Sequence, residues 1–583
     1  MQALRDQHVL ILGLGLSGLA MARWCTRHGA IVTVADTREA PPQAAVLQRD
    51  CPQARLVCGP LGAQLLEGQP IRMVLRSPGL SPAQHAPVTD AARALGLWQG
   101  GELSLFAMAL RDLQAQHGYA PKVLAITGTN GKTTVTSLTG QLLERAGWRV
   151  KVAGNIGPTL LDMLAQALDE APALAAQPQA DAPELDSDRP ADAVAPALTL
   201  AEDAAAPDTP APALDAAPET PAAADADASP DADDAPAPVL VPPPPAPVDL
   251  GLPQAWVLEL SSFQLDACDD FEPTAAVVLN LTQDHLDWHG SLAAYGQAKA
   301  RIFGQQALMV LNREDPLVMA MLPAPVRVRL QKPQLRAHVC FGADMPQRPG
   351  DWGIERVNGM SWLVRALPAD ETIKRRRGEA EDLFLQRLMP ADALRIRGLH
   401  NATNALAALA LASSTGAPLG PMLYGLREYR GEPHRVEPVA IVHEVEYFDD
   451  SKGTNVGATV AALRGLGAER RVVVILGGDG KGQDFAPLAD AVAQHARAVV
   501  LIGRDGPAIG QALAGTEVPQ HQASDMAQAV QIASEQARSG DAVLMSPACA
   551  SFDMFRDYAH RAEVFRQAVV DLAERAGLTL EGA

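Results

Sequence analysis

The stretch of this chain best equipped for chemistry is Thr127–Thr134, which reads Thr-Gly-Thr-Asn-Gly-Lys-Thr-Thr. Its two glycines allow backbone N–H groups to close around a polyphosphate, and Lys132 can neutralise the outer oxygens. The hydroxyl of Thr133 or of Thr134 can join the shell of a Mg²⁺ ion, which prefers hard oxygen ligands. Only two residues separate the glycines, so the sequence predicts a nucleotide-binding loop of a narrower kind than the widespread G-x-x-x-x-G-K-[ST] form.

Two further polar groups follow apolar, strand-like segments. Glu259 closes the segment that begins at Ala255, and His285 lies in the polar cluster 280–287 behind another such segment. The carboxyl ends of parallel strands share one edge of a sheet, so Glu259 is placed to hold Mg²⁺ beside the phosphate loop. A lone histidine is more often structural, but several polar residues gather at this strand end and favour a ligand role for His285.

Other candidates lie on helical patterns and on loops of the last third. Lys299 belongs to the helical segment 295–302, where the default interpretation is a surface lysine. Asn401 and Asn404 share one face of a helix, and Asn401 can also cap the start of that helix, which is compatible with a binding role. Four polar loops lie at or beside strand ends and together predict one composite site: 434–436, 449–455, 477–481 and 546–552.

Hydrophobic patterning supplies the elements that must position these groups. An apolar run, Val123–Ile126, precedes the phosphate loop, and a helical pattern, Val135–Ala146, follows it. Strand, glycine turn and helix form the context that a phosphate-binding loop requires. The alternative, a glycine-rich turn with a surface lysine, does not explain these flanks.

A second glycine turn, Gly13–Gly18, lies between a strand-like run and a helical pattern that continues to His28. The next strand, Ile31–Ala35, ends at Asp36, which is typical of a Rossmann βαβ unit. The third glycine comes one residue early for the dinucleotide fingerprint, so a packed turn without a ligand is the alternative.

The chain of 583 residues is too long for one hydrophobic core, and we expect three α/β domains. An N-terminal Rossmann-like domain would span 1–109, and a central P-loop ATPase-type domain with a parallel sheet would span 110–430. The C-terminal domain, 431–583, is predicted to be Rossmann-like because strand and helix patterns alternate in it. Its strand patterns are 471–476, 498–502 and 542–545.

An Ala/Pro/Asp-rich tract, 165–253, interrupts the central domain. Few aromatic residues and many prolines prevent it from burying enough apolar area to offset chain entropy, which predicts disorder. Strand-like residues with site chemistry resume after it, so we interpret it as an insertion in a domain loop. Between 169 and 249 lie 18 acidic residues and one arginine, so this part holds −17 of the net charge of −20.

The remaining charge is near zero, which argues against a nucleic-acid-binding surface. The one basic run, Lys374–Arg377, has acidic neighbours and is interpreted as a solvated loop. Six cysteines lack paired spacing, the first residues lead directly into a strand pattern, and no stretch of about 18 apolar residues occurs. We therefore expect a soluble, cytoplasmic monomer with no signal peptide and no membrane span.

As a set, these motifs resemble those of the Mur ligases of peptidoglycan synthesis. Besides the phosphate loop, the motifs are Glu259–Leu265, Asp284–Asp287, His400–Asn404, His434–Glu437, Asp450–Asn455 and Gly477–Lys481. The likeness covers almost the whole chain except roughly 165–253 and 343–390. The member that joins D-glutamate to UDP-N-acetylmuramoyl-L-alanine is favoured by Gly13–Gly18, Ser77–Leu80 and Ser546–Ser551.

The resemblance implies an ATP-dependent amide ligation that proceeds through an acyl phosphate. The catalytic residues would be Lys132, Glu259, His285 and Lys299. Two Mg²⁺ ions would lie among Thr133, Thr134, Glu259, His285 and Lys299. Lys299 would carry CO₂ as a carbamate that assists at Mg²⁺, which replaces the interpretation as a surface lysine.

The resemblance also implies which residues bind the substrates. ATP would contact Gly128, Thr129, Asn130, Gly131, Lys132, Thr133, Thr134, Asn401, Asn404, Arg435 and Asp450. The UDP-sugar substrate would meet Leu16, Ser17, Asp36, Arg38 and Gly79 at its UDP end and Asn155 at its muramoyl-alanine part. D-glutamate or the nascent product would meet Thr454, Lys481, Ser546, Phe552 and Tyr558. Phe552, Tyr558 and Ala562 depart from residues common in the family and would shape the wall of the amino-acid pocket.

Three other functions were weighed against this one. Another amide ligase of the superfamily, such as the folylpolyglutamate synthetase type, is disfavoured by the complete N-terminal nucleotide-sugar domain. A Rossmann NAD(P) enzyme is disfavoured by the early third glycine and the phosphate loop, and a non-catalytic scaffold would use the acidic tract. Because the central and C-terminal segments both contribute nucleotide groups, we expect the site to be complete only when these domains close.

Overall fold

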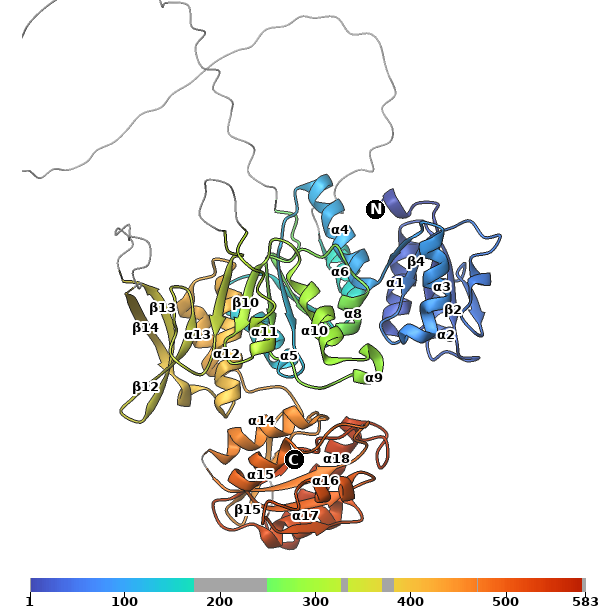
Figure 1. Cartoon of the computed structure of the whole chain (residues 1–583). Helices are drawn as coiled ribbons and strands as arrows, with labels where there is room; N and C mark the ends of the chain where they lie inside the picture. The colour runs from blue at the N-terminus through green and yellow to red at the C-terminus, as the bar shows by residue number, and fades with distance from the viewer. Residues whose placement is uncertain (1, 172–248, 327–333, 370–381, 469, 579–583) are drawn as a thin grey trace, which may run out of the picture. The chain divides into compact units, whose positions relative to one another are not determined.

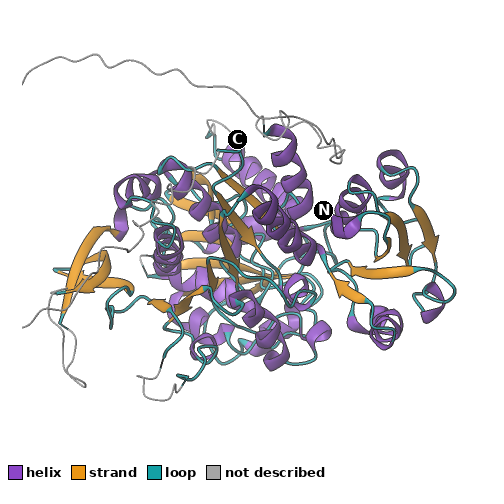
Figure 2. Ribbon diagram, turned by 90° about the horizontal axis from the view of Figure 1, so that it is seen from above, coloured by secondary structure: helices purple, strands orange, loops and turns teal. Residues whose placement is uncertain are grey.

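The computed structural model describes residues 2–171, 249–326, 334–369, 382–468 and 470–578. They form three separate sheets with helices against their faces, which confirms the predicted three-domain α/β class (Figure 1; Figure 2). Most of the predicted disordered insertion and the basic run Lys374–Arg377 lie outside the described residues. Within the described ranges, no helix is long and apolar enough to cross a membrane.

The N-terminal sheet is parallel throughout, in the order β3-β2-β1-β4-β5. Its strands are β1 His8–Leu12, β2 Ile31–Asp36, β3 Arg55–Cys58, β4 Ile71–Arg76 and β5 Trp98–Gly100. Its helices are α1 Leu16–Arg27, α2 Ala44–Asp50 and α3 Pro82–Ala94. The predicted βαβ unit is confirmed, and the strand order reverses between β1 and β4, where open α/β sheets usually bind ligands.

The early third glycine of the first turn has a steric cause. Gly13 adopts a φ of +88°, in the left-handed region that favours glycine. A Cβ on Gly18 would lie 2.0 Å from the carbonyl oxygen of Gly13, so only glycine lets α1 start this close to the turn. The spacing therefore serves the packing of the helix against the turn.

The central sheet has the order β14-β13-β12-β11-β10-β9-β6-β8-β7. Its strands are β6 Lys122–Thr127, β7 Val150–Gly154, β8 Ala255–Glu259, β9 Ala275–Val278, β10 Leu308–Asn312, β11 His338–Phe341, β12 Trp352–Val357, β13 Met360–Pro368 and β14 Leu383–Pro390. Its helices are α4 Glu102–His117, α5 Lys132–Arg145, α6 Leu160–Glu170, α8 Ser262–Asp266, α9 Leu286–His289, α10 Leu292–Ala300, α11 Pro316–Met319, α12 Leu399–Ser413 and α13 Leu419–Glu428. The neighbours from β7 to β12 run parallel, as predicted.

The segment 343–390, whose role the sequence did not indicate, adds strands to this sheet. The neighbours from β12 to β14 run antiparallel. Trp352, Ile354 and Leu363 are buried in the same core as the apolar residues of α12. The described part of the segment therefore supports the helix that carries Asn401 and Asn404.

Helix α6 extends to Glu170, so the residues from 165 to 170 are helical, although the sequence pattern assigned them to the insertion. Leu160, Leu161 and Leu164 of this helix are buried in one apolar cluster with residues of α1 and α4. An amphipathic helix therefore occupies the first part of the predicted insertion.

The C-terminal sheet has the order β15-β16-β20-β17-β18-β19. Its strands are β15 Glu437–Val442, β16 Val445–Asp449, β17 Val472–Gly477, β18 Ala496–Ile502, β19 Gln520–Gln522 and β20 Ala542–Met545. Its helices are α14 Val456–Gly467, α15 Leu488–His495, α16 Gly506–Ala512, α17 Met526–Gln536 and α18 Tyr558–Arg575. The parallel Rossmann-like sheet is confirmed from β16 to β19, but β15 pairs antiparallel with β16 through a two-residue turn at His443 and Glu444.

Candidate active site

Strand pairing brings the predicted groups to one edge of the central sheet. Glu259 pairs with Ile126 of β6 and with Gly154 of β7, and Val278 of β9 pairs with Thr127. The phosphate loop and the loops after β7, β8 and β9 therefore start side by side at the carboxyl ends of their strands.

Neighbouring side chains shape the phosphate loop. Helix α5 begins directly after Gly131, whose φ is +82°, and a Cβ there would lie 2.8 Å from Asn404 Oδ1. Asn280 Oδ1 accepts a hydrogen bond from the N–H of Asn130 at 2.8 Å, and Asn280 Nδ2 donates to the carbonyl oxygen of Asn130 at 3.1 Å. An asparagine behind β9 thus holds the loop backbone, although the sequence pattern did not single it out.

Two lysines share one acceptor in this loop. Lys132 Nζ and Lys299 Nζ donate to the carbonyl oxygen of Gly128, at 2.8 Å and 2.9 Å. Lys299 is only 1% exposed, so the interpretation of its helical pattern as a surface lysine is wrong. Burial, and then the charge of Lys132, hold the pKa of Lys299 well below its usual range. Burial also lowers the pKa of Lys132.

Glu259 has, at the same edge of the sheet, a carboxylate oxygen to which no described residue donates a hydrogen bond. It is 2% exposed at the end of β8, and its Oε1 accepts a hydrogen bond from Asn155 Nδ2 at 2.7 Å. Its Oε2 is buried and has no hydrogen-bond partner among the described residues. A buried carboxylate oxygen without a partner is costly, and it is the type of ligand that Mg²⁺ prefers.

The other candidate metal ligands lie at the same edge of the central sheet as Glu259. His285 precedes α9 with a φ of +54°, and burial lowers its pKa, so the imidazole keeps a lone pair to offer. The two candidate hydroxyl ligands, Thr133 and Thr134, are buried. Thr133 Oγ1 accepts a hydrogen bond from Arg435 Nη2 at 2.6 Å. The carboxylate and hydroxyl oxygens suit Mg²⁺.

A cavity of about 110 Å³ collects the predicted nucleotide residues. Its walls include Asn130, Gly131, Thr134, Asn401, Asn404, Arg435 and Asp450. Asn404 Nδ2 donates to Asn401 Oδ1 at 3.1 Å, and Asn401 Nδ2 donates to the carbonyl oxygen of Arg397 at 2.8 Å. Gly398, not Asn401, caps α12, so the capping interpretation of Asn401 is wrong.

Asp450 forms the buried acidic wall of this cavity. Ser546 Oγ donates to Asp450 Oδ2 at 2.6 Å, and both residues are buried. Burial raises the pKa of Asp450 to about 7. Ser546, which is predicted to meet the amino-acid substrate, thus also orients Asp450, which is predicted to hold the nucleotide.

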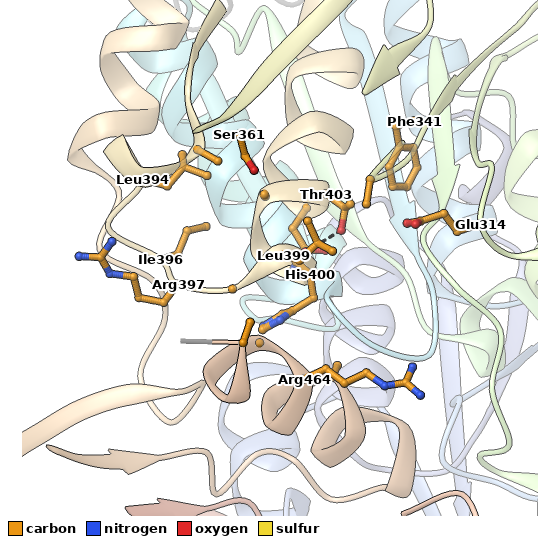
Figure 3. Close-up of a pocket in the computed structure, with 18 of the residues that line it drawn as sticks. Glu314, Phe341, Ser361, Leu394, Ile396, Arg397, Leu399, His400, Thr403 and Arg464 are labelled. Atoms are coloured by element: carbon orange, nitrogen blue, oxygen red, sulfur yellow. Dashed lines mark hydrogen bonds between the residues drawn. The ribbon is translucent and has the colours of Figure 1, made fainter. Parts of the chain in front are cut away.

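A larger cavity, of about 590 Å³, shares Asn280, His400 and Asn404 with the nucleotide cavity (Figure 3). Its other walls include Leu394 before α12, Arg356 and Ser361 of the added strands, and Arg464 of α14. The space beside the nucleotide residues therefore extends to the segment 343–390, which no sequence motif indicated.

The residues predicted for the UDP end lie at the carboxyl edge of the N-terminal sheet. Asp36 accepts hydrogen bonds from the N–H of Leu14 at 2.6 Å and from Arg38 Nη2 at 2.8 Å. The bond from Arg38 is the main cause that lowers the pKa of Asp36 to about 2. At the start of α1, Leu16 is exposed and Ser17 is half-buried, and in the loop after β4 Gly79 is exposed. Asp36 thus orders the glycine turn and orients the half-exposed Arg38.

Family models match three successive parts of the chain. The match is to the Mur ligase MurD-like N-terminal domain at 7–97, the Mur ligase middle domain at 126–177 and 251–412, and the Mur ligase glutamate ligase domain at 434–549. The chain belongs to the Mur ligase family.

Three similar proteins carry the name UDP-N-acetylmuramoylalanine--D-glutamate ligase. The protein of Albidiferax ferrireducens is 60% identical over 583 residues, which cover 100% of both chains. That of a Polaromonas species is 51% identical over 666 aligned positions, with 100% of both chains covered. That of Burkholderia pseudomallei is 49% identical, with 98% of both chains covered.

In the C-terminal domain of this Mur ligase, the residues predicted for D-glutamate lie on three loops and at the start of α18. Lys481 is exposed with a φ of +50°, Phe552 is 70% exposed and Thr454 is half-buried. Tyr558 begins α18, and Lys452 Nζ lies 5.2 Å from the centre of its ring. Lys452 belongs to a motif that the sequence singled out, but the sequence gave it no role.

Arg561 ties two of these loops together and was also missed. It is fully buried and donates to the carbonyl oxygens of Cys549 at 3.1 Å and Ser451 at 2.7 Å. Burial lowers its pKa to about 10. No sequence signal distinguishes a buried arginine from a surface one within a helix, so only the structure reveals it.

Proposed function

We propose that this Mur ligase joins D-glutamate to UDP-N-acetylmuramoyl-L-alanine at the cost of ATP, which yields ADP and phosphate. The observation that carries the reaction type is the pair Lys132 and Lys299 on the Gly128 carbonyl oxygen, beside the unpartnered Oε2 of Glu259. Such a set compensates charge where a phosphoryl group is transferred between anions. The choice of substrates is supported by the name that these three relatives share.

In the first proposed step, the L-alanine carboxylate becomes an acylating group. One of its oxygens attacks the γ-phosphorus of ATP, the bond from that phosphorus to the β–γ bridging oxygen breaks, and ADP leaves. The product is an acyl phosphate. Lys132 would offset the negative charge of the phosphoryl group, because both reactants are anions.

In the second proposed step, the amine of D-glutamate attacks the acyl carbon. The bond from that carbon to the phosphate oxygen breaks, so inorganic phosphate leaves with one oxygen of the original carboxylate. The nitrogen loses a proton as the amide forms. Binding of D-glutamate is assigned to Thr454, Lys481, Ser546, Phe552 and Tyr558.

The residues present fit the Mg²⁺ ions that the family implies. Two ions would be held by Thr133 or Thr134, Glu259 and His285, and when bound they would neutralise the carboxylate and phosphate oxygens. Glu259 can present Oε2 because Asn155 binds its other oxygen. The muramoyl-alanine contact predicted for Asn155 is therefore adjacent to the proposed metal ligand.

We assign a carbamate to Lys299. Its amine nitrogen would bond to the carbon of CO₂ and release a proton, which leaves an anion. The lowered pKa supports this assignment, because only the neutral amine has the lone pair that attacks CO₂. Lys299 Nζ is already placed by Gly128 O and by Thr127 Oγ1 at 3.2 Å.

An assay with a panel of amino acids tests the proposed function. The protein is mixed with UDP-N-acetylmuramoyl-L-alanine, ATP, Mg²⁺ and one of L-alanine, D-glutamate or a diamino acid. We expect phosphate release only with D-glutamate. Release with another amino acid would assign a different amino-acid substrate, and no release with any of them would refute the proposed reaction.

We further propose that the enzyme works as a cytoplasmic monomer whose central and C-terminal domains close on the substrates. Nucleotide residues come from both domains, which supports closure. Small-angle scattering should show compaction when an ATP analogue and the product bind. An unchanged radius of gyration would contradict closure.

A further inference from the structure

Arg435 lies in a turn whose backbone is strained on both sides. His434 and Val436 have φ values of +64° and +49°, in the left-handed region that residues other than glycine seldom adopt. For Val436 this conformation is a marked outlier, because its side chain is β-branched. Such strain persists only where the surroundings hold the turn, and it often marks a functional site.

Three carboxyl groups hold the two strained residues. The backbone N–H of His434 donates to Glu437 Oε2 at 2.8 Å, and the ring Nδ1 lies 2.8 Å from Asp449 Oδ2. Because a carboxylate oxygen can only accept, Nδ1 carries the proton in this bond. The backbone N–H of Val436 faces the carboxyl group of Asp450 and partly offsets the rise that burial causes in the pKa of that group. Both ends of the turn are therefore fixed from within the C-terminal domain.

A guanidinium neutralises this cluster. Arg566, on α18, forms an ion pair with Glu437, and its Nε lies 3.8 Å from Asp449 Oδ2. The ligand atoms of His434, Glu437 and Asp449 lie within 4.8 Å of one another, a spacing that could also suit a metal ion. Arg566 already provides the positive charge that the buried Asp449 needs.

From this turn, Arg435 reaches the phosphate loop. Its Nη2 donates to Thr133 Oγ1 at 2.6 Å. Its Nε is buried and has no hydrogen-bond partner in the part of the chain that the structure describes. Arg435 lines the nucleotide cavity, and an unpartnered arginine N–H is a donor that a ligand oxygen can satisfy.

We propose that His434, Glu437, Asp449 and Arg566 are positioning residues that hold the strained turn and keep Arg435 directed at the phosphate loop. They act on the nucleotide through Arg435. The inference rests on the proposed function, because it takes ATP as the ligand of Arg435.

Substitutions at His434 test this role by separating KM from kcat. His434→Ala should raise the KM for ATP about tenfold, the loss expected for one charge-assisted hydrogen bond. The kcat should stay within about twofold, because binding and not the chemical step is affected. His434→Asn should recover most of the loss, because its amide N–H can replace Nδ1 and asparagine tolerates a positive φ. Arg566→Met should behave like His434→Ala.

His443→Ala is the matched control. His443 is also left-handed, with a φ of +51°, but it is exposed in the turn between β15 and β16. Its replacement should leave both kinetic constants unchanged. Thermal unfolding of each variant verifies that the KM is measured on folded protein.

A double-mutant cycle with Arg435→Ala decides whether the cluster acts through Arg435. In that background, His434→Ala should change the KM for ATP by less than about twofold. An equal effect in both backgrounds, or no recovery with His434→Asn, would overturn the inference.

Calorimetric titration with ADP separates this inference from the proposed function. We expect the unaltered protein to bind ADP and the His434→Ala and Arg566→Met variants to bind it more weakly. Equal binding by all three would refute the positioning role and leave the proposed function standing. Absence of ADP binding by the unaltered protein would refute both.

Discussion

Two turns of this chain each contain a left-handed glycine and lead into a helix, but different charged side chains contact them. After β1, Gly13 has a φ of +88° and leads into α1, and after β6, Gly131 has a φ of +82° and leads into α5. Each turn lies at the carboxyl edge of a parallel sheet, where a helix N-terminus can receive an anion. The first turn contacts a buried carboxylate, Asp36, and the second contacts Lys132 and Lys299.

We infer from this comparison that the glycines determine the shape of each turn, whereas the charged side chains around it determine which ligand binds. At the first turn, Asp36 accepts a hydrogen bond from the N–H of Leu14, and the half-exposed Arg38 is the cation that we propose for a UDP group. At the second turn, both lysines bind a carbonyl oxygen and bring positive charge to the place where phosphates are expected. We therefore assign binding of the sugar nucleotide to the first turn and phosphoryl transfer to the second.

Of the predicted changes, replacing Lys299 at the second turn should have the largest effect on activity. Lys299→Ala should lower kcat by about two to three orders of magnitude, because charge stabilisation of the transferred phosphoryl group is lost. Lys151→Ala, on the edge strand β7 of the same sheet, is the control and should leave kcat unchanged. Activity of the unaltered protein should fall in CO₂-free buffer and return with bicarbonate. A fully active Lys299→Ala variant would remove this residue from the site.

Glu259→Gln should have the next largest effect. We expect kcat to fall about 100-fold and the Mg²⁺ requirement to rise, because an acceptor for the cation is weakened. The melting temperature should stay equal or rise, because an unpaired buried carboxylate oxygen is removed. Glu144→Gln, on the exposed side of α5, should change neither quantity. An unchanged Mg²⁺ dependence in Glu259→Gln would refute the metal-ligand assignment.

Arg38→Ala tests whether the two turns bind separate ligands. The KM for the UDP-sugar substrate should rise about tenfold, because a charge-assisted contact to phosphate is lost. The KM for ATP should not change, which serves as the internal control. A rise in the KM for ATP instead would show that the two turns do not bind separate ligands.

The lowered pKa of Asp36, at the first turn, predicts that stability depends on pH. Folding lowers its pKa from the ordinary value of 3.8 to about 2. A carboxyl group with a lowered pKa stabilises the fold above its ordinary pKa, and this contribution is lost as the pH falls from about 4 toward 2. The difference in melting temperature between the unaltered protein and Asp36→Asn should therefore be largest above about pH 5 and shrink below about pH 4. A difference that is constant with pH would contradict a role for the charge.

Replacing residues 175–248 with a short Gly/Ser loop should have the smallest effect. Closure entropy grows only as 3/2 RT ln n, so stability should be equal or slightly higher. Asn155 and Glu259, on either side of the tract, already contact each other in the site. We expect kcat within a few-fold of the unaltered protein. A large loss of activity in a folded variant would show a catalytic or regulatory role of the tract.

The pieces of both turns could be predicted from the sequence because their causes are local. A strand, a glycine turn and a helix follow one another within Lys122–Arg145, and the same order holds from β1 to α1. The polar residues behind β8 and β9 could also be placed, because parallel strands present their carboxyl ends on one edge.

The rest depends on contacts between distant residues. Lys299 looked like a surface lysine because its burial depends on the Gly128 carbonyl, 171 positions away. The antiparallel β15 turns at His443 and Glu444, which lack the glycine or asparagine that usually marks such a turn. The cluster around Arg435 assembles Asp449 and Arg566 from separate elements, which no spacing in the sequence indicates.

Isotope transfer from the substrate carboxylate tests the proposed reaction most directly. UDP-N-acetylmuramoyl-L-alanine labelled with ¹⁸O in its carboxylate is incubated with ATP, Mg²⁺ and D-glutamate, and the released phosphate is analysed by mass spectrometry. An acyl-phosphate path predicts one ¹⁸O atom in each phosphate released with D-glutamate, and no labelled phosphate when L-alanine or a diamino acid replaces it. Unlabelled phosphate formed together with the amide product would contradict phosphoryl transfer to the carboxylate.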